Sequence, residues 1–181
     1  MKSSRFNAIA ICAMVATALL AGCASSTLVP MKTMSTEVRT YRSVRVSVES
    51  RVAQDVTKEI STLQGEIVSR IRAAKRFEDV ALVDTTASDG LLVKTSVIGV
   101  RKVGGGTRFL LGAFAGKASI TADVEFVDAA SGAVLGSYSV KEKTGSSGFA
   151  GTTGDCVEKA AKAIAKLTTE HFAAAEGAAA R

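Results

Sequence analysis

The chain has 181 residues, of which 47% are apolar and 22% charged, with a formal net charge of +6. Its only long apolar run covers residues 8–21, which is short for a helix that spans a hydrocarbon core of about 30 Å, and no other window is as apolar, so a polytopic membrane protein is excluded. One histidine, no tryptophan and three cysteines argue against a His-rich metal site, a zinc ribbon and a disulfide-rich scaffold.

The N-terminus has the layout of a lipoprotein signal peptide. Lys2 and Arg5 precede the apolar run, and small residues follow it. The run ends in Leu-Ala-Gly-Cys at 20–23, which resembles a bacterial lipobox, where the cysteine thiol is acylated and the chain is cut in front of it. An uncleaved membrane anchor is the alternative, which the shortness of the run disfavours. We therefore expect residues 1–22 to be a signal peptide and Cys23 to be the lipidated N-terminus of the mature chain.

The residues that follow Cys23 indicate where the mature protein is held. Removal of the signal peptide leaves 21 basic and 17 acidic residues, a net charge of +4. In lipoproteins an Asp after the cysteine favours the inner membrane, whereas Ala24 and Ser25 follow here, which predicts a palmitate-bearing anchor in the outer membrane that faces the periplasm. Residues 23–40 contain the only proline, Pro30, and show no periodicity, so we expect them to form a lipidated tether.

From Tyr41 onward the sequence alternates between strand and helix patterns. Val44, Val46 and Val48 alternate with polar residues, as in a half-buried strand. Residues 52–77 carry an apolar stripe at helical spacing. Further strands are expected at 80–83, 91–103, 118–127 and 134–144, a hairpin loop at 128–132, and a second helix from Asp155 to Phe172.

This order of elements predicts the architecture of the mature protein. It indicates an α+β two-layer sandwich, in which two helices cover one face of a mostly antiparallel sheet of about four or five strands. We expect residues 41–172 to form one periplasmic domain and residues 173–181 to be a disordered tail.

The segment 104–117 has the most unusual composition. Three glycines open it, but the spacing of Gly112 and Gly116 before Lys117 fits no nucleotide-binding loop. Its bulky apolar side chains either form a glycine-hinged finger that meets a partner or lipid headgroups, or fold back to cap the core. The residues of this segment that we expect to bind a partner are Arg108, Phe109, Leu111, Phe114 and Lys117.

These residues also carry a family resemblance. With Arg101, Gly104–Gly106, Arg108, the segment 111–118 and the hairpin residues 124–135, the region 91–146 resembles the DUF4410 lipoproteins. That family has no assigned activity, so the resemblance implies a lipoprotein domain and no reaction. More loosely, the order of elements is similar to small periplasmic lipoprotein domains of the TolB N-terminal type, several of which are adaptors in envelope assemblies.

The remaining candidate residues favour no chemistry. His171 stands alone on the second helix, and the carboxylates show no acid–base spacing, so we predict no catalytic residue, metal site, cofactor or nucleic-acid site. Cys156 is either a buried apolar residue or an exposed thiol that pairs between molecules. We expect a non-catalytic lipoprotein that binds envelope proteins. The alternatives are a cell-wall- or lipid-active enzyme and a pore-forming oligomer subunit, and the sequence leaves the partner and the oligomeric state open.

Overall fold

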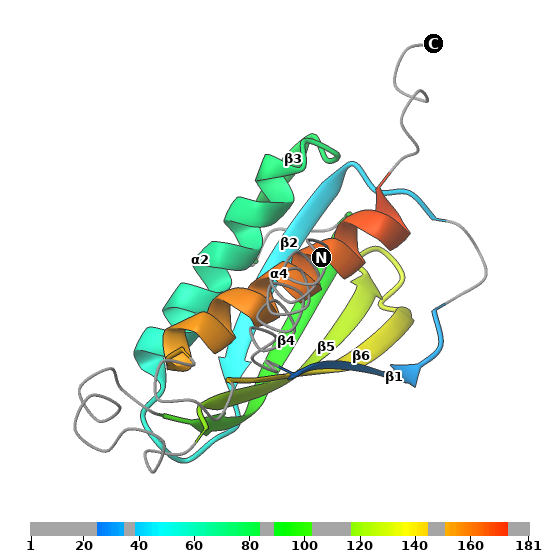
Figure 1. Cartoon of the computed structure of the whole chain (residues 1–181). Coiled ribbons are helices and arrows are strands. Elements are labelled where there is room, and N and C mark those ends of the chain that lie inside the picture. The colour runs from blue at the N-terminus through cyan, green and yellow to red at the C-terminus, as the bar shows by residue number, and fades with distance from the viewer. Residues whose placement is uncertain (1–24, 35–38, 84–88, 103–116, 145–150, 174–181) are drawn as a thin grey trace, which may run out of the picture.

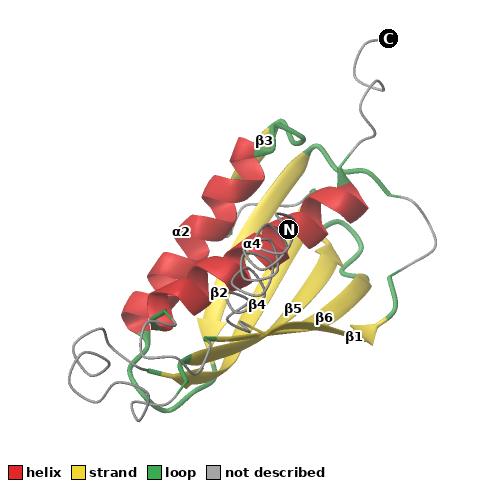
Figure 2. Cartoon of the chain, viewed as in Figure 1, coloured by secondary structure: helices red, strands yellow, loops and turns green. Residues whose placement is uncertain are grey.

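Six strands form one open sheet, and two helices cover one of its faces (Figures 1 and 2). The computed structural model describes residues 25–34, 39–83, 89–102, 117–144 and 151–173. Within these residues the elements are β1 (Ser25–Lys32), β2 (Ser43–Ser50), α2 (Thr57–Ala73), β3 (Asp79–Leu82), β4 (Leu91–Arg101), β5 (Ser119–Asp128), β6 (Val134–Lys143) and α4 (Thr153–Phe172). The α+β architecture with two helices is therefore confirmed. In this part of the chain, no helix is both long and apolar enough to cross a membrane.

The sheet is larger and more mixed than we expected. Its strand order is β1-β6-β5-β4-β2-β3, so it has six strands where the sequence predicted four or five. β2 is parallel to both of its neighbours, β3 and β4, whereas the other pairs are antiparallel. The parallel pairing follows from the long helix between β2 and β3, because a crossover through a helix returns the chain to the same end of the sheet.

The additional strand, β1, lies inside the segment that we expected to be an irregular tether. It pairs antiparallel with β6, from Ser25 opposite Lys143 to Lys32 opposite Ser137. Within the described residues β1 is an edge strand with one neighbour, a position that tolerates Pro30 and does not require alternation of apolar and polar residues. Only Ala24 separates Cys23 from this strand, so the structured domain begins much closer to the expected lipid than the sequence predicted.

The core lies between the sheet and the two helices. The alternating strands turn one set of side chains toward the helices, with Phe126 and Ile120 of β5 fully buried among them. α2 contributes Leu63, Ile67 and Ile71 from its apolar stripe. On α4 the buried positions are mostly small or medium-sized, such as Ala160, Ala161 and Ile164, and α4 packs over β5 and β6 as well as against α2. Burial of these stripes supplies the main stabilisation of both helices.

The two helices differ from the sequence prediction at their ends, since α2 begins at Thr57 and ends at Ala73, inside the expected range 52–77. α4 starts one turn earlier than expected, because Thr152 is its N-cap and Asp155 is the third residue of its first turn. The Asp155 carboxylate accepts hydrogen bonds from the backbone N–H and from the hydroxyl of Thr152. These hydrogen bonds, the backbone one above all, hold the pKa of Asp155 below its ordinary value. The charged carboxylate thus compensates the N-terminal end of α4 from within the chain.

One glycine fixes the place where the chain crosses from β3 to β4. Gly90 precedes β4 and has a φ of +100°, a conformation that L side chains rarely adopt. A Cβ atom at this position would collide with the Ser43 hydroxyl and lie 2.8 Å from the Ser43 carbonyl oxygen. The Gly90 carbonyl also accepts a hydrogen bond from the Ala129 backbone N–H at 2.9 Å. Gly90 is therefore held between the start of β2 and the β5–β6 hairpin.

At the hairpin end of the sheet, Tyr41 joins three parts of the chain. Its hydroxyl donates a hydrogen bond to Asp128 Oδ2 at 2.7 Å, and its backbone N–H donates to the Phe172 carbonyl at 3.1 Å. Burial, followed by the hydrogen bond to Asp128, raises the pKa of Tyr41 to about 12. Hydrogen bonds from Ser131 and Tyr41 lower the pKa of Asp128 to about 2. Tyr41 therefore ties the segment before β2 to the hairpin and to the end of α4.

Candidate functional site

Most of the residues that the sequence nominated lie outside the described residues. These are the lipidation site and four of the partner-binding candidates: Cys23, Arg108, Phe109, Leu111 and Phe114. The fifth candidate, Lys117, is described, and its side chain is exposed just before β5. Whether the segment 104–117 meets a partner or caps the core therefore stays a prediction.

The flanks of that segment nevertheless place it on the molecule. β4 ends at Arg101 and β5 begins at Ser119, and these two residues are paired in the sheet. The chain therefore leaves and re-enters the described structure at one end of the sheet. That end is opposite the β5–β6 hairpin, because β5 runs from it toward the hairpin loop that follows Asp128.

The β1 edge of the sheet exposes apolar side chains. Leu28, Val29 and Met31 have exposed fractions of 43%, 49% and 59%. The register pairs Leu28 with Val140 on the helix-covered face, but α4 packs over β5 and β6, and β1 lies beyond them (Figure 1). An exposed apolar edge strand is a surface that can pair with another chain. The sequence analysis missed this surface, although three apolar residues around Pro30 were its signal.

The other edge of the sheet, β3, also exposes apolar side chains. Leu82 at the end of β3 is 48% exposed, and the following residue, Val83, is 44% exposed. β3 pairs only with β2, so its other side has no strand neighbour among the described residues. The pairings along the sheet make β3 antiparallel to β1. The domain thus has two open apolar edges of opposite strand direction.

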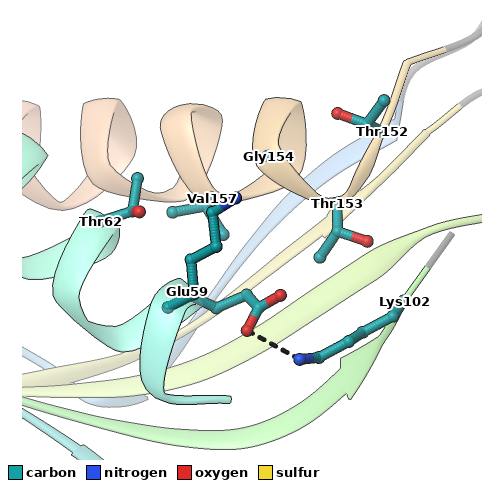
Figure 3. Close-up of a pocket in the computed structure, with 8 residues that line it drawn as sticks. Glu59, Thr62, Lys102, Thr152, Thr153, Gly154 and Val157 are labelled. Atoms are coloured by element: carbon teal, nitrogen blue, oxygen red, sulfur yellow. Dashed lines mark ion pairs between the residues drawn. The ribbon is translucent and has the colours of Figure 1, made fainter. Parts of the chain in front are cut away.

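A cavity of about 400 Å³ lies between the first turns of the two helices (Figure 3). It is lined by Lys58, Glu59, Thr62, Lys102, Thr152, Thr153, Gly154 and Val157. Lys102 Nζ is 2.9 Å from Glu59 Oε2 and donates a hydrogen bond to the Asp55 carbonyl at 2.6 Å. Lys102 thus has an acidic partner in this cavity, and Asp155 compensates the N-terminus of α4.

The side chains of Cys156 and His171 are engaged in packing contacts. Cys156 is 1% exposed, and its thiol lies 3.6 Å from the Ala118 carbonyl oxygen, so the buried alternative for this residue is confirmed. His171 is exposed, and its ring stacks on Tyr138 with centroids 6.4 Å apart. Among the described residues, no group of three His, Cys, Asp or Glu side chains could hold a metal ion. The open sheet edges are therefore the features of this part of the chain that call for a functional explanation.

Comparison with known proteins gives a family and a fold. A family described as "Domain of unknown function (DUF4410)" matches residues 29–148, about two thirds of the chain. No curated protein sequence matches the chain.

Two solved structures of one protein have a similar fold. The PelC dodecamer from Paraburkholderia phytofirmans is 16% identical, covers 83% of this chain and 100% of its own, and has a TM-score of 0.56. A leucine-to-methionine variant of the same dodecamer is also 16% identical, with the same shares of both chains and a TM-score of 0.53. At these identities the similarity shows the fold alone.

Proposed function

Because this chain belongs to the DUF4410 family, whose description assigns no activity, we propose a function from the chain's own features. It is a non-catalytic lipoprotein, anchored in the outer membrane through Cys23, whose periplasmic domain binds other envelope proteins. The first of these partners is a second copy of the same chain. Self-association through the two sheet edges builds the surface on which the other partners assemble.

The observation that carries this proposal is the pair of open apolar edges. Leu28, Val29 and Met31 lie along β1, and Leu82 and Val83 lie at the end of β3. Since β1 and β3 run in opposite directions, a copy placed beside β1 in the same orientation presents its β3 for antiparallel pairing. A contact between two different surfaces is head-to-tail, and it closes into a ring when the rotation between copies allows it.

The similar solved structures support a repeated interface. Both PelC structures are described as dodecamers, and PelC shares this fold. An assembly of identical subunits uses the same interfaces again at every subunit. We propose an interface of that kind for this chain, formed by its β1 and β3 edges.

Site-specific photocrosslinking in cells tests this proposal. A photoreactive amino acid is introduced at Val29 on the β1 edge, at Leu82 on the β3 edge, or at Lys162, an exposed position on α4 that serves as the matched control. The expected result is a ladder of multimers of the chain from both edge positions and none from α4. Exclusive capture of other proteins, or no capture from either edge, would show that self-association does not use these edges.

A charged substitution supplies the second arm of the test. Val29→Lys places a charge on the apolar edge, where it remains solvated in the monomer but would be buried in the interface. The variant should keep the melting temperature of the monomer and lose the ladder that forms from Leu82. Thr27→Lys, on the same strand and also exposed, controls for an added charge outside the apolar group.

A further inference from the structure

The expected lipid attachment site lies next to one end of the sheet. Ser25 is the first residue of β1 and follows Cys23 by two positions, a distance of at most about 7 Å along an extended chain. Ser25 is paired with Lys143, Lys143 with Ser119, and Ser119 with Arg101, so one row crosses four strands. An acyl anchor at Cys23 would therefore bring this whole row to the membrane surface.

Basic side chains gather at the same end. We call Arg101, Lys117, Lys141 and Lys143 the basic end of the sheet. β6 ends at Lys143 and carries Lys141 two residues earlier. Arg101 is the last residue of β4, and Lys117 lies just before β5. The cross-strand register places Arg101 and Lys143 on the same face as Ser119, the face without helices.

These cations are not neutralised within the described structure. None of the four forms an ion pair with another described residue, whereas the nearby Lys102 is paired with Glu59. The acidic residues near this end have other surroundings. Asp155 accepts a hydrogen bond from Thr152, Asp55 accepts one from Thr57, and Glu49 is paired with Arg51. Glu142 is buried on the helix-covered face. Among the described residues, the basic end thus presents positive charge without an acidic partner, beside the expected site of lipid attachment.

We propose that the basic end rests on the anionic phospholipid headgroups of the membrane that holds the lipid, so that the strands stand upright on it. The proposal builds on the lipidation of Cys23 and specifies how the anchored domain is oriented. Juxtamembrane cations bind an anionic surface, each adding about fivefold to the association, and the attraction decays within about 8 Å at physiological salt. Only the end of the sheet next to the anchor lies within that range.

This orientation agrees with the use of the two sheet edges. When the basic end faces the membrane, the open edges of the sheet along β1 and β3 face sideways, along the plane of the membrane. Neighbouring copies can then meet edge to edge while each keeps its own lipid in the membrane. The shared orientation also places every copy at the same distance from the membrane surface.

Fluorescence quenching in vesicles measures the orientation directly. The purified lipidated protein is labelled at a new cysteine, Ser119→Cys at the basic end or Ala130→Cys in the hairpin loop, since the native Cys156 is buried. The vesicles contain phosphatidylcholine with or without phosphatidylglycerol, and a quencher on the lipid headgroups. β5 separates the two positions by about 30 Å. Strong quenching at Ser119→Cys and little at Ala130→Cys, increased by phosphatidylglycerol, is the expected result.

Charge reversal tests the cause of the orientation. The triple variant Arg101→Glu, Lys117→Glu, Lys143→Glu should remove the difference between the two labels and its dependence on phosphatidylglycerol. All three residues are at the surface of the sheet end, and thermal unfolding by circular dichroism verifies that the fold is kept.

A matched variant and a flotation measurement separate the outcomes. Lys94→Glu, Lys162→Glu and Lys166→Glu change the charge equally at exposed positions elsewhere, and should leave the quenching pattern intact. Equal quenching at both labels, or an unchanged pattern in the basic-end variant, would overturn the proposed orientation. If the protein does not float with vesicles at all, the lipid anchor fails and the proposed function fails with it. If the protein floats with vesicles but both labels are quenched equally, only the proposed role of the basic end is refuted.

Discussion

Replacement of Gly90 by alanine should destabilise the domain far more than the addition of one methyl group suggests. The residue has a φ of +100°, for which a non-glycine residue costs about 1–2 kcal/mol. The added Cβ would also lie 2.8 Å from the Ser43 carbonyl oxygen, a backbone atom of β2 that cannot rotate away. Overpacking of this kind costs about 1–3 kcal/mol more. We expect a total loss of about 3 kcal/mol in the free energy of unfolding.

Two other glycines separate these contributions. Gly132 in the hairpin loop has a φ of +70° and no atom within 4 Å of an added Cβ, so Gly132→Ala should cost only the conformational part, about 1–2 kcal/mol. Gly65 lies within α2, also with open space around an added Cβ. Because alanine favours a helix interior by about 1 kcal/mol over glycine, Gly65→Ala should stabilise the protein.

Urea unfolding followed by circular dichroism measures all three variants on the same mature chain. The expected order of stability is Gly65→Ala above the parent chain, then Gly132→Ala, then Gly90→Ala. At about 2–4 °C per kcal/mol for a chain of this size, Gly90→Ala should also melt roughly 10 °C below the parent. Equal losses at Gly90 and Gly132 would refute the close approach of the crossing to β2, and with it the reason for a glycine there.

The other predictions concern the Tyr41 contact, the two cysteines and the nominated loop. Tyr41 keeps its proton in the folded protein up to a pKa of about 12 against an ordinary value of 10, so its contribution to stability is complete below pH 10 and is lost as the pH rises through 12. Tyr41→Phe should therefore remove part of the fall in stability between these pH values, and a parallel fall in both proteins would contradict the hydrogen bond. Cys156 should resist a thiol reagent in the native protein and react readily in denaturant, because it is 1% exposed; rapid native labelling would show that α4 opens. Cys23→Ser should abolish incorporation of labelled palmitate, and equal labelling would remove the lipid anchor. Phe109→Ala with Phe114→Ala should weaken partner capture and leave the melting temperature unchanged, whereas a large drop in melting temperature would assign this loop to the core.

Sequence patterns predicted those helices and strands that bury one face against the core, because their apolar residues recur at a regular spacing. The alternation of Val44, Val46 and Val48 and the stripe of α2 follow directly from contact with one apolar layer, so their periods are visible in the sequence. The sheet order is not encoded in this way. Whether β2 pairs with β4 or another strand depends on contacts between distant residues, such as Gly90 against Ser43.

The candidate surfaces were likewise hard to predict, because they depend on strand pairing and not on a local pattern. A strand at the edge of a sheet contacts one neighbour, and on β1 neither face is fully buried, so Leu28, Val29 and Met31 leave no clean alternation. The basic end could not be recognised from the sequence either. Arg101 and Lys143 are 42 positions apart, and only the register of three antiparallel strands places them in one row. Composition did indicate the unusual segment between β4 and β5, but only the register shows to which end of the sheet it belongs.

The position of β1 also determines how a pull on the anchor would act on the domain. A lipid at Cys23 would pull on β1 from its first residue, along the axis of an upright strand. The hydrogen bonds between β1 and β6 lie across that axis, so the force is shared among them from Ser25 to Lys32 and must shear them together. Had the strand been attached at right angles to the force, the same bonds would break one after another. The short connection to the lipid thus makes the pairing of β1 with β6 a mechanical clamp, which resists unfolding of the domain when it is pulled against its anchor.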